Sequence, residues 1–563
     1  VSIFKYLQIN LINKKLISID LDNSSFMQWR LTKPGQNYTK NKNLESLIMA
    51  IIKKALVLVI TFVFMGSGLV AAIEEPVKLT SGEITGTLVD NGVQAFLGIP
   101  YAAAPVGELR WQPPQKATPW KGVKVTDRHG PGCIQPGELY MSEDCLFLNI
   151  WTKSDGNEKL PVMVWIHGGG WAFGSNSVGT YDGSAFANNG VVLVSVNYRM
   201  NSFGFMAHPA LSAESENGVS GNYAILDHIA ALEWVQDNIE EFGGDKNNVT
   251  IFGESAGGAS IYSLLATPMA KSLFHKAVSE STWINADNVT DLKNANGFSE
   301  SAEVLGERAI ATALDMAQVT GPDTLSKMRS LSAQEVLDLE HGVTLIVDGW
   351  LYDKAPIEIF EEGSHNNVPI ITGYNDGEGL MFVRPDRAPA TLSDQRSLRI
   401  QQLGNLGVDL VDFYVAEDEG QLFDTEVDYS SDSVFIRASR ELALASALAG
   451  QQDTYLYVFA RNSRDPSQRA AHFMEVPYVF GTLPERAPGE DKELSQLMND
   501  YWVQFAKTGT PNGQGLPVWP RYDLEKQMHQ VLDVPISQGA TDRKAQLDEM
   551  DRYMRARYEA AKH

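Results

Sequence analysis

The stretch Val249-Thr-Ile-Phe-Gly-Glu-Ser-Ala-Gly-Gly-Ala-Ser-Ile-Tyr-Ser-Leu-Leu265 decides the fold. It begins with the apolar, β-branched run typical of a buried strand and continues with apolar residues at helical spacing. Glycines two before and two after Ser255 permit a sharp turn that exposes the serine hydroxyl above a sheet edge. This five-residue Gly-x-Ser-x-Gly pattern occurs by chance in many loops, but here a strand precedes it and a helix follows it, as the motif requires. The stretch therefore predicts a nucleophilic serine at the N-terminus of a helix, where backbone N–H groups stabilise an oxyanion.

A second motif, His167-Gly-Gly-Gly-Trp171, directly follows the apolar run 160–166. Three glycines let backbone N–H groups approach a substrate carbonyl, because no Cβ stands in the way. A flexible turn is the alternative role of such glycines, but it is less expected after a strand and upstream of a serine turn. The motif therefore predicts the remaining donors of an oxyanion hole.

Patterns typical of strands and helices alternate along the chain. Val77 to Leu88 suggests a hairpin at a sheet edge, apolar strand runs follow, and helical spacing of apolar residues recurs between them. The strand runs are 145–151, 160–166, 191–198, 249–252, 276–283, 369–373 and, as the last one, 455–460; the clearest helices are 222–239 and 494–508. This rhythm predicts an α/β fold, a mostly parallel central sheet flanked by helices. Residues 285–345 and 385–450 are expected to be helical excursions that supply the walls of the site, the second lying over it.

Composition limits the function classes. The 563 residues are 44% hydrophobic and 21% charged, which is a globular composition, and one large core is compatible with this length. The formal net charge of −24 argues against a nucleic-acid or anionic-membrane partner, because such partners need Lys/Arg surfaces.

The N-terminal residues predict export. Residues 1–48 show no sustained period and are expected to be a non-native upstream extension, with translation starting at Met49. Residues 49–72 combine a basic start, an apolar core and a small-residue end, the pattern of a signal peptide cleaved after Ala72. A membrane anchor is the alternative, but the apolar core is short for a span. We expect a domain at 73–563, exported to the periplasm or the medium, without stable membrane insertion after cleavage.

The serine needs a base within hydrogen-bond reach and a third group that orients this base. In strand–turn–helix hydrolases the acid and then the histidine follow the serine along the chain. After Glu378 only three histidines remain, His472, His529 and His563. His472 lies one loop after the last expected strand, whereas His529 belongs to a polar segment and is expected to be solvated. His472 is therefore the candidate base.

The acid is less clear from the residues. Glu378 lies between two glycines just after a short strand, in a turn that can project a carboxylate. Asp376 is a close rival, and Asp348 and Asp353 are weaker ones. Spacing alone leaves Glu378 and Asp376 open.

Only two cysteines occur, Cys133 and Cys145. In an exported protein, two cysteines separated by a loop favour a disulfide. By reducing the entropy of the unfolded chain, such a bond stabilises the fold by about 3 kcal/mol. We also expect a buried ion pair between Glu143 and Arg199 near the site.

Four motifs together resemble the type-B carboxylesterase family of α/β-hydrolases, which includes the cholinesterases, over residues 77–560. Residues 142–151 are similar to the family's second signature and residues 252–258 to its active-site signature. Residues 374–379 resemble its acid loop and residues 471–481 its histidine segment.

The resemblance implies an α/β-hydrolase fold and settles the acid in favour of Glu378. A two-step hydrolysis of small carboxylic esters through an acyl-enzyme is implied, with no cofactor and no metal. The implied residues are the catalytic Ser255, Glu378 and His472, the oxyanion-hole donors Gly169, Gly170 and Ala256, and the family's first disulfide, Cys133–Cys145.

Two departures from the family pattern bear on the substrate. The loop between Cys133 and Cys145 is shorter than in cholinesterases and has no tryptophan, so the aromatic wall for choline is expected to be absent. Gly377 replaces the usual aspartate before the glutamate, which is expected to loosen the acid loop. We therefore expect a general carboxylesterase of the bacterial kind. The alternatives are an exported lipase and, since some relatives lack the triad, a non-catalytic binding or adhesion protein.

Overall fold

The structure is a computed structural model that divides into two compact units, Val1–Val70 and Ala71–His563. Within the first unit it describes only the backbone of β1 (Leu7–Leu11), β2 (Lys15–Ile19) and β3 (Trp29–Leu31), a three-stranded antiparallel sheet where no strand was expected. The expected signal peptide at 49–72 and His563 lie outside the described residues. Those of the second unit are 73, 75–137, 140–284, 288–319, 321–451, 453–462, 464–465, 468–541 and 543–561.

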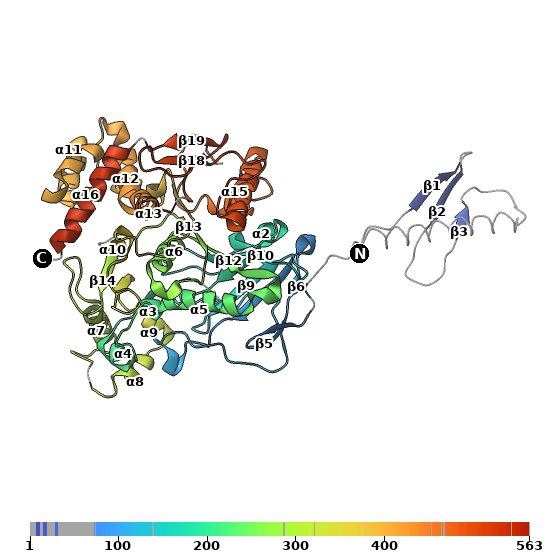
Figure 1. Ribbon diagram of the computed structural model, residues 1–563, viewed down its shortest axis with the longest axis horizontal. Coiled ribbons are helices and arrows are strands. Elements are labelled where there is room, and N and C mark those ends of the chain that lie inside the picture. Colours follow the sequence, from blue (N-terminus) through green and yellow to red (C-terminus); the bar gives the residue numbers. More distant parts are fainter. Residues whose placement is uncertain are drawn as a thin grey trace, which may run out of the picture. The chain divides into compact units, whose positions relative to one another are not determined.

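The second unit is organised around a central sheet of eleven described strands, in the order β19-β18-β17-β16-β13-β12-β10-β11-β9-β7-β6 (Figure 1). Neighbours from β11 to β18 run parallel, while β9, β7 and β6 at one edge and β19 at the other pair antiparallel. The strands are β6 (Thr87–Leu88), β7 (Gln94–Pro100), β9 (Phe147–Thr152), β10 (Leu160–Ile166), β11 (Val192–Val196), β12 (Gly244–Glu254), β13 (Lys276–Glu280), β16 (Ile370–Asn375), β17 (Thr454–Phe459), β18 (Met528–Leu532) and β19 (Ser537–Ala540).

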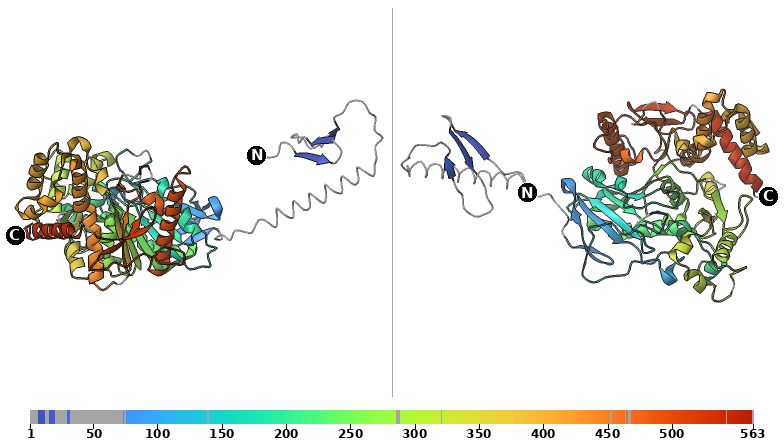
Figure 2. Two further views of the ribbon diagram at one scale, coloured as in Figure 1. Left: turned by 90° about the horizontal axis from the view of Figure 1, so that it is seen from above. Right: turned by 180° about the vertical axis from the view of Figure 1, so that it is seen from behind.

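Helices cover both faces of this sheet (Figure 2). Successive side chains of a strand point to opposite faces, and along β10 Val164 enters one apolar core while Trp165 enters another. The first core includes residues of α5 and α6, the second residues of α2 and α15. Because both faces are buried, the central strands are mostly apolar where they pass through the core, which explains the continuous apolar runs in the sequence.

Helices form where helical spacing was expected, shorter ones lie between them, and α16 near the C-terminus is a long helix that was not expected. They are α2 (Ser184–Asn188), α3 (Asn201–Phe205), α4 (Pro209–Glu214), α5 (Tyr223–Asn238), α6 (Ala256–Ala266), α7 (Ala302–Ala313), α8 (Thr324–Arg329), α9 (Ala333–Leu337), α10 (Pro356–Glu361), α11 (Leu392–Leu403), α12 (Leu422–Ser431), α13 (Arg437–Leu448), α14 (Val476–Val479), α15 (Gly489–Thr508) and α16 (Lys544–Ala561). The two excursions are α7 to α9, bracketed by β14 (Val289–Asp291) and β15 (Leu345–Val347), and α11 to α13.

Two expectations about the sheet need correction. The expected hairpin forms as β4 (Val77–Leu79) and β5 (Gly82–Thr85), but it belongs to a separate small sheet with β8 (Val123–Val125). Residues 455–460 are not the last strand, because β18 and β19 follow and extend the sheet beyond β17. His529, expected to be solvated, is only 8% exposed within β18. The polar segment around it becomes a strand through its pairing with β17, a long-range contact that local patterning does not encode.

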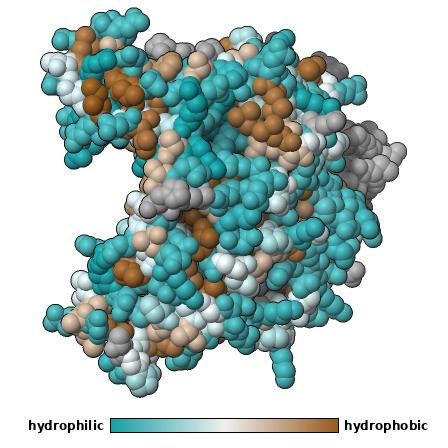
Figure 3. Space-filling view, turned by 60° about the vertical axis from the view of Figure 1, so that its left-hand side comes forward, coloured by the Kyte–Doolittle hydropathy of each residue, from teal (hydrophilic) through white to brown (hydrophobic). Residues whose placement is uncertain are grey.

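The face of the molecule in Figure 3 is mostly hydrophilic, with apolar side chains gathered in a few patches. Within the described part of the chain, no helix is both long and apolar enough to cross a bilayer.

Candidate active site

Ser255 occupies the turn between β12 and α6 with φ 56° and ψ −118°, a conformation that non-glycine residues adopt only when the surroundings hold them there. Its N–H donates to the carbonyl of Glu280 on β13 at 2.9 Å. A Cβ on Gly257 would lie 2.0 Å from the carbonyl oxygen of Ile166, and one on Gly258 would lie 2.3 Å from that of Glu280. Glycines are therefore required here because α6 packs directly on the ends of β10 and β13.

The structure brings His472 and Glu378 together. Nδ1 of His472 lies 2.5 Å from Oε2 of Glu378, and both side chains are buried. The other carboxylate oxygen, Oε1, accepts hydrogen bonds from the Ser281 hydroxyl at 2.6 Å and from the Asn375 N–H at 2.8 Å. Glu378 follows β16, and His472 lies in the loop after β17, the next strand of the sheet. This pair can hold one imidazole tautomer and stabilise its protonated form.

The outer nitrogen of the imidazole, Nε2 of His472, has no hydrogen-bond partner in the described part of the chain. Its charged neighbour is Oε1 of Glu254, 3.1 Å away, on the residue that precedes Ser255. Burial alone lowers the pKa of His472, but the carboxylates of Glu254 and Glu378 raise it more, so that its pKa lies above the ordinary value. Nε2 therefore lies beside the residue that precedes Ser255, where no hydrogen bond within the described residues occupies it, and catalytic hydrogen bonds often close only when substrate binds.

The rival carboxylates have other partners. Oδ1 of Asp376 accepts the backbone N–H of Ala470 at 2.6 Å. Asp348 accepts three backbone N–H groups of its own turn, and Asp353 is exposed. Of the four candidate acids, Glu378 is the one that contacts His472.

The glycine motif lies against the serine turn. A Cβ on Gly168 would lie 3.1 Å from Cβ of Ser255, so the two segments are in van der Waals contact. Gly169 and Gly170 have φ values of 106° and 62°, and neither N–H donates a hydrogen bond within the described residues. Ala256 is the first residue of α6, where N–H groups lack intrahelical acceptors. These three donors are thus available to an oxyanion.

Two side chains that were not predicted from the sequence hold the loop 167–174, which contains the glycine motif and is called the glycine loop. The Tyr198 hydroxyl donates to the carbonyl of His167 at 2.8 Å, and its ring stacks on the His167 imidazole. The amide of Gln135 pairs with both backbone groups of Gly174, at 2.7 and 2.8 Å. A Cβ on Gly174 would lie 2.5 Å from the His167 ring. The residues next to Tyr198 and Gln135 in the sequence do not indicate these roles, because each side chain contacts a loop far away in the sequence.

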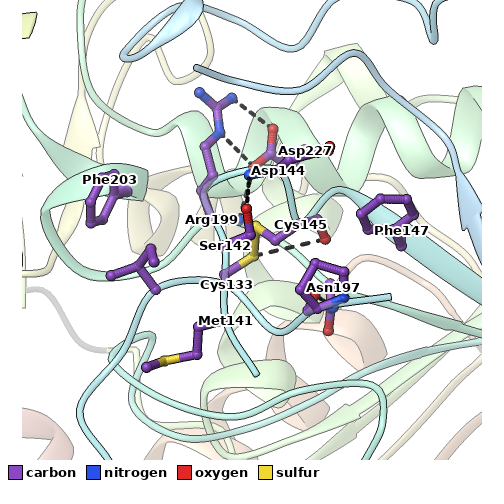
Figure 4. Close-up of a disulfide and its surroundings, with 12 residues drawn as sticks. Cys133, Met141, Ser142, Asp144, Cys145, Phe147, Asn197, Arg199, Phe203 and Asp227 are labelled. Carbon is purple, nitrogen blue, oxygen red and sulfur yellow. Dashed lines mark hydrogen bonds and ion pairs between the residues drawn. A yellow bond between two sulfur atoms is a disulfide. The ribbon is translucent and has the colours of Figure 1, made fainter. Parts of the chain in front are cut away.

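Gln135 belongs to the loop closed by the disulfide between Cys133 and Cys145, whose expected pairing is confirmed. The bond is drawn in Figure 4, where Arg199 points toward Asp227. The expected pair between Glu143 and Arg199 was wrong. Arg199 forms a buried ion pair with Asp227 at 2.7 Å, and Glu143 pairs with Arg110 at 2.5 Å. Arg199 therefore pairs with a carboxylate on the helix α5, Asp227, and not with Glu143 in the disulfide loop.

Further carboxylates surround the histidine, and the sequence indicated none of them, because acidic side chains are normally solvated. Glu254, Glu280 and Glu475 are each at most 1% exposed. Oε1 of Glu280 accepts the indole N–H of Trp502 at 2.8 Å, and burial raises the pKa of all three carboxyl groups. Burial therefore disfavours the charged form of these three groups, while the charges of Glu254 and Glu475 raise the pKa of His472.

Aromatic rings cover the histidine. The ring of Phe435 lies 4.5 Å from that of His472 between centroids, and Phe382 lies 5.5 Å away. Phe435 belongs to the excursion at 385–450, which therefore lies over the site as expected. Phe382 is 52% exposed and offers an apolar surface beside the imidazole.

Parallel strands, crossover helices and a strained serine turn at the end of β12 make this protein an α/β-hydrolase. The chain belongs to the carboxylesterase family, whose sequence profile matches residues 74–552, and is a carboxylic ester hydrolase of type B. It is 37% identical over 465 residues to the fumonisin B1 esterase of Sphingopyxis macrogoltabida, covering 79% of this chain and 84% of that protein. It is 34% identical over 489 residues to para-nitrobenzyl esterase of Bacillus subtilis, covering 81% and 94%.

Solved structures agree with this assignment. A carboxylesterase of Geobacillus stearothermophilus has a TM-score of 0.73 and 33% identity, covering 84% of this chain and 99% of its own. A solved PNB esterase has a TM-score of 0.72 and 30% identity over the same shares. The expected family and fold class are therefore confirmed.

Proposed function

We propose that the protein is a serine carboxylesterase that works through Ser255, His472 and Glu378. The observation that carries the proposal is the buried contact between Nδ1 of His472 and Glu378, with Nε2 next to the serine turn and without a hydrogen-bond partner among the described residues. Ser255 attacks the ester carbonyl while Nε2 takes its proton, and Glu378 stabilises the imidazolium. The proton then passes to the leaving alkoxide, and water repeats the attack on the acyl-enzyme.

The oxyanion of each tetrahedral intermediate is bound by the N–H groups of Gly169, Gly170 and Ala256. Their availability and the contact of the glycine loop with Ser255 support this role. Such preorganised donors act without reorganisation during the reaction, and one of them is worth about 10²–10³ in rate.

The substrate class is a small carboxylic ester with an apolar part. The exposed ring of Phe382 beside His472 supports an apolar acyl or alcohol group. The disulfide loop has no tryptophan, which argues against selectivity for choline esters.

The test is hydrolysis of a chain-length series of p-nitrophenyl esters by the purified protein and by Ser255→Ala, with choline esters and emulsified triglycerides added. We expect activity on short acyl chains that disappears in the variant. Marked activation at a lipid interface would favour an exported lipase, and preference for choline esters would contradict the substrate class. Equal inertness of both proteins would favour a binding protein on the same fold.

We also propose that the protein is exported, after cleavage following Ala72, to the periplasm or the medium. The pattern at 49–72 and the disulfide between Cys133 and Cys145 support export, since such bonds persist in oxidising compartments. N-terminal sequencing of the secreted protein tests this, and a mature N-terminus before Met49 would contradict it.

A further inference from the structure

Asp376, the close rival of Glu378, joins the acid loop (residues 374–379) to the loop that follows β17 and carries His472, which we call the histidine loop. Its Oδ1 accepts the N–H of Ala470 at 2.6 Å, and the carbonyl of Ala470 accepts the N–H of Gly377 at 2.9 Å. The side-chain amide of Asn375 donates to the carbonyl of Ala471 at 2.8 Å. Both backbone groups of Ala470 and the carbonyl of Ala471 are therefore held by the acid loop.

Close packing accompanies these hydrogen bonds. A Cβ on Gly377 would lie 2.7 Å from Cβ of Arg469 and 3.0 Å from the carbonyl oxygen of Ala470. The histidine loop and Leu380 thus fill the space that a side chain at position 377 would need.

Asp376 is itself fixed to the sheet. Its N–H donates at 3.0 Å to the carbonyl of Phe459, the last residue of β17, and it directly follows the end of β16. Desolvation raises the pKa of Asp376 to about 6, although the Ala470 N–H and the charge of Arg469 lower it. The carboxylate is therefore a desolvated acceptor attached to two central strands.

We propose that Asp376 is a positioning residue for the catalytic base: by accepting the Ala470 N–H, it fixes the backbone two residues before His472. The proposal rests on the proposed function, in which His472 is that base. Without this acceptor the N–H of Ala470 loses its partner, and the histidine loop shifts away from Glu378 and Ser255. A displacement of about 1 Å can cost about 10² in rate.

A misplaced imidazole affects esters unequally. p-Nitrophenolate leaves without a proton, whereas ethoxide must receive one from Nε2 of His472. A general loss of stability would lower the turnover of both esters by the same factor, because it lowers only the amount of folded enzyme.

The experiment compares kcat and KM of the full-length protein on p-nitrophenyl butyrate and ethyl butyrate for Asp376→Ala and Asp376→Asn. The matched control is Asp523→Ala, because Asp523 is also partly buried and also accepts backbone N–H groups, among them that of Lys526 at 2.6 Å. Melting temperatures are measured alongside. If Asp376→Ala is not recovered folded, Asp376→Ser replaces it, since its hydroxyl ends one bond short of the acceptor position.

We expect Asp376→Ala to lower kcat about tenfold on p-nitrophenyl butyrate and about hundredfold on ethyl butyrate, with KM nearly unchanged. Asp376→Asn keeps an acceptor oxygen and should restore most of the activity, while Asp523→Ala should affect both esters little. Equal losses on the two esters, or a loss no larger than that of Asp523→Ala, would overturn the positioning role. Full activity of Ser255→Ala would instead overturn the proposed function.

Discussion

Alanine substitutions at Gly169 and Gly170, the two neighbouring glycines proposed to form the oxyanion hole, should have very different effects. A Cβ on Gly169 would lie 1.9 Å from the carbonyl oxygen of Phe173. In addition, the φ of Gly169, 106°, is outside the left-handed region that alanine adopts. Overpacking costs about 1–3 kcal/mol, and backbone strain costs a similar amount. Relief of this clash turns the peptide plane and removes the Gly169 N–H from the oxyanion, which costs about 10²–10³ in kcat. A Cβ on Gly170 would meet no atom of the described residues within 4 Å, and its φ of 62° costs alanine about 1–2 kcal/mol.

The assay is steady-state hydrolysis of p-nitrophenyl butyrate by both variants, together with urea unfolding. We expect Gly169→Ala to lose at least about hundredfold in kcat and Gly170→Ala less than about tenfold, with KM nearly unchanged in both. The unfolding midpoint should fall further for Gly169→Ala.

Similar activities of the two variants would refute this reasoning, because the structure distinguishes the two positions only by the clash and the backbone angle. A larger loss in Gly170→Ala would show that substrate, rather than protein, occupies the space beside that glycine.

Three further results are expected. In Glu254→Gln the loss of a negative charge lowers the pKa of His472, so the acidic limb of the pH profile of kcat/KM should move to lower pH; an unchanged limb would contradict the charge coupling. Replacing Cys133 and Cys145 by serine should lower the free energy of unfolding by about 3 kcal/mol, measured by urea titration, and no change would show that the loop is constrained by its other contacts. Gly377→Asp, which restores the residue usual in the family, should lower both stability and kcat because no space exists for its Cβ; a gain in either would contradict the packing described.

Local patterns predicted much of the central sheet. The run 160–166 coincides with β10, and the helix expected at 222–239 forms as α5. The strand β10 was predictable because it is buried on both faces and is therefore mostly apolar. The helix α5 was predictable because its apolar residues recur at helical spacing. β18 was missed because its polar segment forms a strand only by pairing with β17.

The partners of Arg199 and Glu143 were wrong for a related reason. Residue types indicate that a buried arginine needs a carboxylate, but not which one, and Asp227 and Arg110 reach them from other segments. Spacing alone likewise did not decide between Asp376 and Glu378, two residues apart in one loop, and only the resemblance to the family selected Glu378.

The sequence by itself determined the fold class, the serine turn with its glycines and the identity of the family, because these depend on local geometry and on short motifs. Only the tertiary structure decided what Asp376 holds and that Tyr198 and Gln135 anchor the glycine loop. Such contacts join residues up to 94 positions apart, and their geometry follows from how the strands and loops pack in space.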